Sequence, residues 1–262
     1  MTPRPIGTFC WSDLGTTNAE AAKAFYAALC GWTYTDIPMG DAGTYTMVHA
    51  AGHEIGGLYA LAGPMFEGVP SHFLFYVRVA DVDATVGRCA ELGGRVEMPG
   101  HDIPERGRMA MLADPAGARF AIYEGRGHDG TAVPEDAAGV FCWHELQTRD
   151  PEGAVGFYRE LFGWSAKVDG GAQPYTEFSL GVGDRAFAGM IKMDERWGEA
   201  PPSWMGYLNV ADCDAAAQQV VSLGGTQFVP PTDIPNVGRF AVLADPTGAM
   251  FAIIRLGAAA AG

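Results

Sequence analysis

The strongest constraint on the fold of this chain is an internal repeat. Residues 79–124 match residues 210–255 at an offset of 131 positions, and "CWSDL" at 10–14 matches "CWHEL" at 142–146 at an offset of 132. A repeat of this length predicts a chain built from copies of one structural unit. The two copies are joined by the Gly- and Pro-containing segment 125–139.

Each half divides again into two modules. In the first module Asn18 is a candidate N-cap for a helix over 19–30, which Gly31 ends. Short alternating segments then predict three strands. The same order recurs three more times, so the predicted βαβββ modules are 9–60, 72–124, 141–192 and 203–255. The predicted domains are accordingly 1–124 and 140–256, with a linker at 125–139 and a flexible tail at 257–262.

Composition excludes several classes of function. A formal net charge of -14 argues against a nucleic-acid or anionic-membrane partner, because both need a positive surface. The sequence shows no signal peptide and no run of 18 apolar residues. The five cysteines form no C-x-x-C pair, which is typical of reduced thiols. We therefore expect a cytoplasmic, globular protein.

The modules resemble the vicinal oxygen chelate superfamily, which includes glyoxalase I, extradiol dioxygenases and bleomycin-binding proteins. The resemblance rests on "FYAALCGW" and "FYRELFGW" after the first strands, and on "DPAG" and "DPTG" before the last strands. The repeated "W-x-[DE]-L-x-T" resembles a tandem branch that is labelled glyoxalase-like or as a hydroxylase. The resemblance implies an α+β fold of two pseudo-twofold-related domains with cup-shaped mixed sheets. It also implies, in many members, a divalent metal at the floor of the cup.

The side chains needed for that metal are missing. The resemblance places His, Glu or Gln ligands at eight positions, which here hold Trp11, Trp143, Leu74, Met205, Ala121, Ala252, Gly57 and Gly189. None of these side chains offers an oxygen or nitrogen lone pair to a divalent ion. The sequence therefore predicts no metal and no other cofactor. His144 is the alternative ligand, although strand alternation directs it away from the face of Trp143.

Two carboxylates occupy the face that carries the metal in relatives. Trp11, Asp13 and Gly15 share one face of their strand, and the equivalent face carries Trp143, Glu145 and Gln147. A buried carboxylate needs a hydrogen bond, an ion pair or a proton. Asp13 and Glu145 are therefore either structural anchors or catalytic acids and bases, and the sequence leaves both interpretations open.

Other residues are candidates for the wall of a ligand site. They recur in matching pairs in the two halves: Tyr45 and Tyr175, Tyr76 and Tyr207, Arg108 and Arg239. The arginines could supply cations to the two acids. Together with Trp11, Trp143 and Gln147, these residues predict an aromatic-lined site for a small molecule.

Three classes of function remain. The first is a metal-independent protein that binds a hydrophobic, aromatic or polyketide-like small molecule. The second is a metal-free isomerase, cyclase, hydratase or lyase that uses Glu145 or Asp13 to move a proton. The third, a metal-dependent lyase or dioxygenase, is opposed by the missing ligands. A chain with an internal pseudo-dimer can be a monomer or a homodimer. Because Glu145 is longer than Asp13 and has Gln147 beside it, we expect the second half to carry the more active site.

Overall fold

The computed structural model describes residues 4–131, 133–134, 137–170 and 174–257. The described part of the predicted tail is therefore residue 257 alone, and residues 258–262 lie outside the described residues. In the described part, none of the helices is both long and apolar enough to span a membrane.

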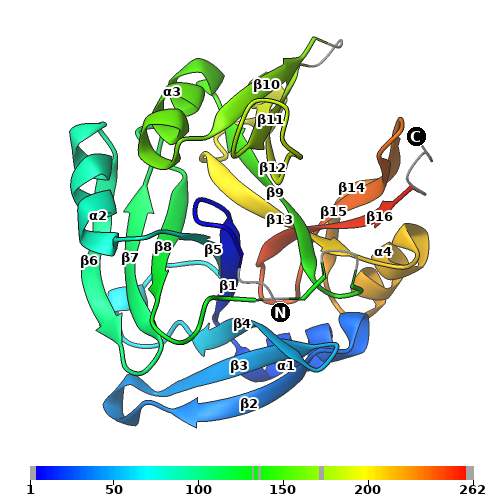
Figure 1. Cartoon of the computed structure of the whole chain (residues 1–262). Coiled ribbons are helices and arrows are strands. Elements are labelled where there is room, and N and C mark those ends of the chain that lie inside the picture. The colour runs from blue at the N-terminus through cyan, green and yellow to red at the C-terminus, as the bar shows by residue number, and fades with distance from the viewer. Residues whose placement is uncertain (1–3, 132, 135–136, 171–173, 258–262) are drawn as a thin grey trace. The chain divides into compact units, whose positions relative to one another are not determined.

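The four predicted modules are present, each as one strand, one α-helix and three further strands (Figure 1). The first half contains β1 Phe9–Thr16, α1 Ala19–Cys30, β2 Thr33–Pro38, β3 Thr44–Ala50, β4 His53–Ala60, β5 His72–Arg78, α2 Val82–Glu91, β6 Arg95–Ile103, β7 Gly107–Ala113 and β8 Arg119–Gly125. The second half contains β9 Phe141–Thr148, α3 Pro151–Phe162, β10 Ser165–Asp169, β11 Tyr175–Ser179, β12 Ala188–Lys192, β13 Ser203–Asn209, α4 Cys213–Ser222, β14 Thr226–Ile234, β15 Gly238–Ala244 and β16 Met250–Leu256.

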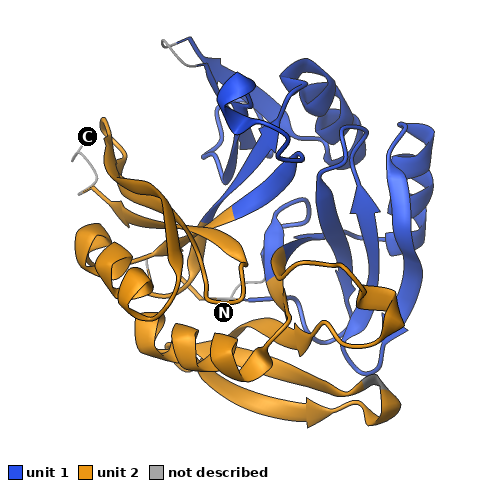
Figure 2. Ribbon diagram, turned by 180° about the vertical axis from the view of Figure 1, so that it is seen from behind, with its two compact units in different colours: residues 1–11, 74–131, 143–205 blue, residues 12–73, 132–142, 206–262 orange. Residues whose placement is uncertain are grey.

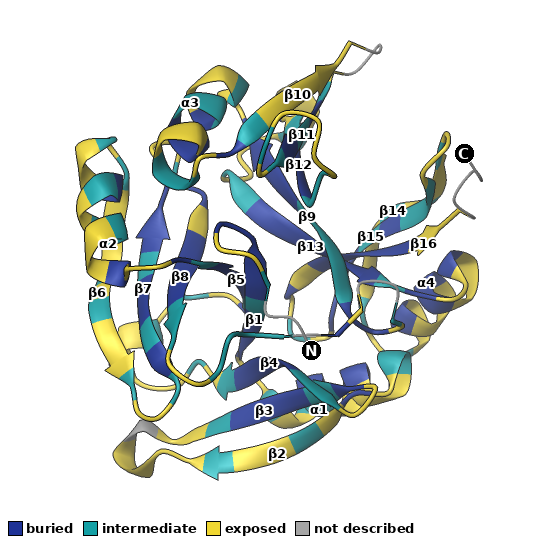
Figure 3. Ribbon diagram, viewed as in Figure 1, coloured by how far each residue is buried: buried dark blue, intermediate teal, exposed yellow. Residues whose placement is uncertain are grey.

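The strands form two eight-stranded mixed sheets with the same internal order. One sheet runs β2-β3-β4-β1-β5-β8-β7-β6, and the other runs β10-β11-β12-β9-β13-β16-β15-β14. The edge strands β2, β6, β10 and β14 carry many exposed residues, whereas the inner strands are mostly buried (Figure 3). The predicted α+β class and the repeated module are thereby confirmed.

The helix ends follow the local sequence. The side chain of Asn18 accepts a hydrogen bond from the backbone N–H of Ala21 at 3.1 Å, which satisfies a donor of the first turn. Gly31 ends the same helix in the left-handed conformation, at φ 70°, where a side chain would be strained. In the second half Asp150 caps α3, and Pro151 takes its first position.

The division of the chain into compact units differs from its division into sheets. Contacts separate two compact units, shown in blue and orange in Figure 2. Unit 1 comprises residues 1–11, 74–131 and 143–205, and thus combines the second and third modules. Unit 2 comprises residues 12–73, 132–142 and 206–262, and thus combines the first and fourth modules. The sheets follow the sequence halves, whereas the compact units do not.

A buried tyrosine from the first helix of each half lies in the core of each unit. In unit 1 the Tyr158 hydroxyl donates to Asp114 Oδ2 at 3.1 Å and accepts from Trp204 Nε1 at 2.9 Å. In unit 2 the equivalent residues are Tyr26 and Asp245. Among the described residues, the Tyr26 hydroxyl and Asp245 Oδ2 meet no partner at ordinary hydrogen-bond geometry, although Asp245 lies close enough to raise the pKa of Tyr26 after burial has raised it. Phe73 stands at the position equivalent to Trp204 and has no N–H to donate.

Candidate functional site

The second half presents a row of polar side chains across three strands of unit 1. Glu145 on β9 lies opposite Gly189 on β12, and Gly189 lies opposite Glu177 on β11. Residues that pair directly across strands share a face of the sheet. The two carboxylates therefore lie on one face, separated by a residue without a side chain.

The next row along the same strands is formed by Gln147, Ile191 and Tyr175. The Tyr175 hydroxyl reaches back over the glycine, because a Cβ on Gly189 would overlap its oxygen. Gly189 is thus required for the close approach of the tyrosine to Glu145.

A chain of hydrogen bonds connects the aromatic residues to the buried carboxylate. Trp143 Nε1 donates to the Tyr175 hydroxyl at 2.9 Å. Tyr175 also hydrogen-bonds Glu145, whose side chain is only 7% exposed. Burial raises the pKa of Tyr175 well above its usual range, and the negative charge of Glu145 raises it further. Tyr175 is therefore protonated at neutral pH. The structure joins Trp143 and Glu145, which strand alternation places on one face, through Tyr175.

The first half has the same arrangement of strands in unit 2 but fills it differently. Asp13 lies opposite Gly57, and the Tyr45 hydroxyl donates to Asp13 Oδ1 at 2.7 Å. A Cβ on Gly57 would overlap that hydroxyl. In the next row Tyr59 lies opposite Gly15, and its hydroxyl is 3.1 Å from the place that a Cβ on Gly15 would take. A second tyrosine thus covers the position that Gln147 holds in the second half.

The charge on Asp13 also acts on this second tyrosine. Burial and then the Asp13 carboxylate raise the pKa of Tyr59 to about 12. Met47, a buried apolar residue, stands in the first half where Glu177 stands in the second. The first site is therefore more apolar and more completely filled by the chain's own side chains.

The other aromatic candidates lie within apolar clusters. Trp11 packs in unit 1 with its ring 5.1 Å from the ring of His128. Tyr76 is 5% exposed, and its hydroxyl contacts Met109 Sδ at 3.8 Å. Tyr207 in unit 2 is equally buried, and its ring lies 6.2 Å from that of Phe240. These three aromatic residues could form an apolar wall of a ligand site. Their contact with a ligand stays a prediction.

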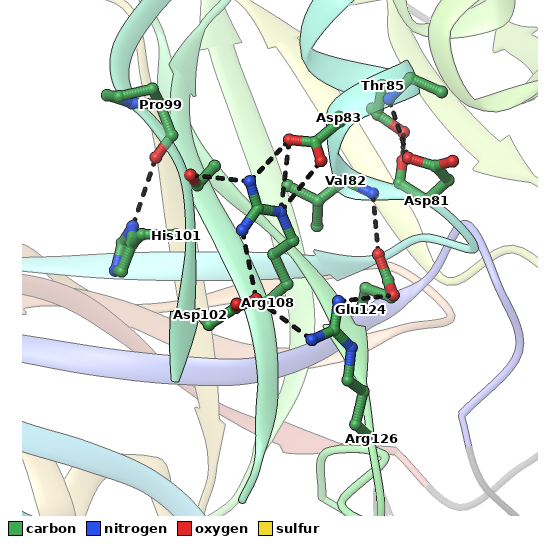
Figure 4. Close-up of polar contacts among 12 residues, drawn as sticks. Asp81, Val82, Asp83, Thr85, Pro99, His101, Asp102, Arg108, Glu124 and Arg126 are labelled. Carbon is green, nitrogen blue, oxygen red and sulfur yellow. Dashed lines mark hydrogen bonds and ion pairs between the residues drawn. The ribbon is translucent and has the colours of Figure 1, made fainter. Parts of the chain in front are cut away.

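The two arginine candidates are held by carboxylates beside the helix of their own module. Arg108 pairs with Asp83 at 2.9 Å and with Asp102 at 3.2 Å (Figure 4). Arg239 pairs in the same way with Asp214 at 2.7 Å and Asp233 at 3.0 Å. Each guanidinium connects the start of a helix to a β-hairpin. This repeated arrangement has the form of a structural clamp.

A recess of about 430 Å³ lies over the first clamp. Its lining is almost entirely charged and comprises Ala80, Asp81, Asp83, Asp102, Arg108, Glu124 and Arg126. The guanidinium groups of Arg108 and Arg126 are already paired with these carboxylates. The recess therefore lacks the apolar walls that a site for a hydrophobic ligand requires.

His144, the alternative metal ligand, lies among aromatic rings of unit 1. Its ring stacks on Phe9 with centroids 4.1 Å apart and meets Phe75 edge-on at 4.9 Å. Burial lowers the pKa of His144 to about 3, so the ring is neutral at physiological pH. These contacts are those of a core residue on the face opposite Glu145.

The residues present do not fit the divalent metal that the superfamily implies. The Tyr45 and Tyr175 hydroxyls occupy the space where a ligand side chain on Gly57 or Gly189 would begin. Trp143 can only donate a hydrogen bond. Across the described ranges of the chain, no group of three or more His, Cys, Asp or Glu side chains could hold a metal ion. We derive no chemistry through a metal.

Several residues of these sites were not singled out from the sequence. They are Glu177, Tyr59 and Ser203, which lie beside the predicted acids or Gln147. Glu177 could have been found, because "TYTM" and "PYTE" align Met47 with it. The others depend on strand register, which the repeat alone does not specify.

The fold and these sites define a class of protein. A manganese(II)-bound glyoxalase from Novosphingobium aromaticivorans is similar with a TM-score of 0.64 and 13% identity, covering 95% of this chain and 82% of that one. The 2,3-dioxygenase LapB from Pseudomonas sp. KL28 is similar with a TM-score of 0.62 and 13% identity, covering 98% and 94%. At these identities the likeness shows the fold alone, which is that of the vicinal oxygen chelate superfamily.

Sequence similarity specifies the family. The model of the glyoxalase-like domain matches residues 11–123 and again residues 143–254. "Putative glyoxylase CFP32" of Mycobacterium tuberculosis (strain CDC 1551 / Oshkosh) is 36% identical over 250 residues, covering 95% of both chains. The anthracycline biosynthesis protein DauV of Streptomyces sp. (strain C5) is 36% identical over 270 residues, covering 98% of this chain and 96% of that protein. The chain belongs to the glyoxalase-like domain family, in a tandem arrangement.

Proposed function

We propose that this protein binds a hydrophobic, aromatic or polyketide-like small molecule without a metal, at the Glu145 site of its second half. The observation that carries the proposal is the hydrogen-bonded chain Trp143–Tyr175–Glu145. It stands on the face where relatives place a metal, and polar side chains take the place of metal ligands.

The direction of the hydrogen bonds follows from the chemistry of the three groups. An indole N–H can only donate, so the Tyr175 oxygen accepts from Trp143. The Tyr175 hydroxyl then donates its single proton in a hydrogen bond to Glu145. Glu145 is thus held as an acceptor by a residue that keeps its proton. A ligand hydroxyl that donates to such a carboxylate would form a charge-assisted hydrogen bond, which is stronger than a neutral one.

The surroundings favour an aromatic ligand. Trp143 and Tyr175 are partly exposed, whereas Glu145 is buried, so aromatic surface borders the polar group. A small-molecule site combines apolar and aromatic walls with a few placed polar groups in this way. The name of the Streptomyces relative, an anthracycline biosynthesis protein, supports a polyketide-like ligand.

The second candidate is a metal-free enzyme in which Glu145 transfers a proton. The buried contact between Glu145 and Tyr175 favours it, since a positioned carboxyl in a partly apolar site can serve as general acid or base. Asp13 with Tyr45 offers the same pair of groups in the first half. A protein that only binds its ligand releases the molecule unchanged, whereas an enzyme releases a product. Mass spectrometry of the released molecule distinguishes the two.

The proposal is tested by calorimetric titration of chelator-treated protein with 2-hydroxyanthraquinone, a planar aromatic probe with one hydroxyl group. We expect saturable binding at about one site per chain, unchanged by added Mn²⁺ or Zn²⁺. Elemental analysis of protein purified without chelator is expected to find no stoichiometric transition metal. Binding that requires a metal, or about one metal ion per half, would contradict the proposal.

A further inference from the structure

Gln147 is a buried amide on the same face as Glu145. It lies two residues further along β9 and is only 5% exposed. Alternate residues of a strand lie about 6–7 Å apart on one face. A flat molecule that contacts Glu145 and lies along β9 would therefore come within reach of Gln147.

The hydrogen bonds of Gln147 leave its amide nitrogen poorly satisfied. The Ser203 hydroxyl donates to Gln147 Oε1 at 3.3 Å, which orients the amide. The nitrogen, Nε2, then faces Met205 Sδ at 3.6 Å. A thioether sulfur is a weak acceptor, whereas an amide NH₂ group carries two donors. A buried donor without a good acceptor costs free energy, so such a group calls for an explanation.

The first half shows that the fold does not need this amide. Gly15 stands at the equivalent position, covered by Tyr59. His72 and Leu74 stand where Ser203 and Met205 stand in the second half. The same strand arrangement therefore forms without the hydroxyl, the amide or the thioether.

We infer that Gln147 determines ligand specificity by donating a hydrogen bond from Nε2 to a carbonyl oxygen of the ligand. This inference rests on the proposed function and names the ligand class more closely. The ligand is a planar hydroxyaryl ketone or quinone, with its hydroxyl on Glu145 and its carbonyl on Gln147. The ligand's carbonyl oxygen replaces the thioether sulfur of Met205 as the acceptor for Nε2. Because a carbonyl is the stronger acceptor, this hydrogen bond favours the binding of ketones over hydrocarbons of the same shape.

The test compares 2-hydroxyanthraquinone with 2-hydroxyanthracene, which has the same ring frame and hydroxyl but no carbonyl. We expect the wild-type protein to bind the quinone about tenfold more tightly, the size of one net hydrogen bond. Gln147→Leu is expected to lower quinone affinity to near that of the anthracene and to leave anthracene affinity unchanged. Gln147→Met provides the same test with a flexible side chain if the leucine variant fails to fold.

Gln227→Leu, which changes an exposed glutamine on β14, is the matched control and is expected to retain the tenfold preference. If both probes bind and Gln147→Leu leaves their affinity ratio unchanged, the inference is overturned while the proposed function stands. An equal loss of affinity for both probes would also overturn the inference, because Gln147 would then support the site without a hydrogen bond to the carbonyl. If neither probe binds the wild-type protein, the proposed function fails and the inference fails with it.

Discussion

The two halves of the chain use one strand arrangement for two different sites. In the first half two tyrosines, Tyr45 and Tyr59, cover Gly57 and Gly15 and pack around Asp13. In the second half Tyr175 approaches the acid, Ile191 stands where Tyr59 stands in the first half, and Gln147 takes the place of the glycine. The two halves thus share a scaffold, and the first site is filled with the chain's own side chains. The second site holds polar groups that the scaffold does not require.

The largest stability difference between equivalent residues is expected at the buried tyrosines of the two helices. Tyr158→Phe would leave Asp114 Oδ2 and Trp204 Nε1 without their shared partner, at a cost of about 1–3 kcal/mol. Tyr26→Phe removes a hydroxyl that meets Asp245 outside ordinary hydrogen-bond geometry among the described residues. It should therefore cost less stability than Tyr158→Phe, because no well-formed hydrogen bond is lost.

Urea unfolding of the two variants beside the wild-type protein measures this difference. Equal losses for Tyr158→Phe and Tyr26→Phe would show that the two cores are equivalent, against the hydrogen bonds described above.

A second difference lies on the strands themselves, where the second half has His144 and the first has Ser12. The folded-state pKa of His144 lies at about 3, against 6.5 for the free side chain. Because the folded state disfavours the charged ring, the stability it contributes is present above pH 6.5 and is lost as the pH falls toward 3. At pH 5 the loss amounts to about 2 kcal/mol.

The comparison of His144→Phe with the wild-type protein isolates this contribution, since other groups titrate in both. The variant is expected to lose less stability than the wild-type protein between pH 7 and pH 5. Parallel stability curves over that range would contradict the buried, neutral state of His144.

The smallest effect is expected at the repeated arginine clamps. Arg108 and Arg239 each pair with two exposed carboxylates, and solvent screens such pairs. Arg108 also donates to the Gly100 carbonyl, at 2.9 Å. We expect Arg108→Gln to lower the melting temperature slightly more than Arg239→Gln, with both decreases smaller in 1 M salt than in 0.05 M salt. A decrease larger than that of Tyr158→Phe would show that these clamps are more than surface pairs.

Much of the fold could be predicted from the sequence because the pattern of one βαβββ module recurs four times. The offsets of 131 and 132 define the modules, and Asn18, Gly31 and Asp150 mark helix ends by local chemistry. The sequence does not predict how modules combine into compact units, because contacts between segments distant in sequence leave no periodic signal. Tyr158 and Asp114 illustrate this, since they meet across 44 positions.

The candidate site could be predicted in part. Strand alternation places Trp143 and Glu145 on one face, and the structure joins them through Tyr175. Alternation gives no information on strand register, so Glu177 and the role of Gly189 were missed. The sequence allowed Arg108 and Arg239 to supply cations to the two acids. The structure instead shows them paired with aspartates of their own module, which compete for the same guanidinium groups.

The central claim is that the second half carries the working site, and the isosteric pair Glu145→Gln and Asp13→Asn tests it most directly. Both changes retain shape and an acceptor for the neighbouring tyrosine, and both remove charge. With 2-hydroxyanthraquinone in calorimetric titration, Glu145→Gln is expected to weaken binding about 10- to 100-fold, the loss of one charge-assisted hydrogen bond. Asp13→Asn is expected to change affinity less than about twofold, with melting temperatures showing that both variants are folded. Loss of binding in Asp13→Asn with none in Glu145→Gln would contradict the claim.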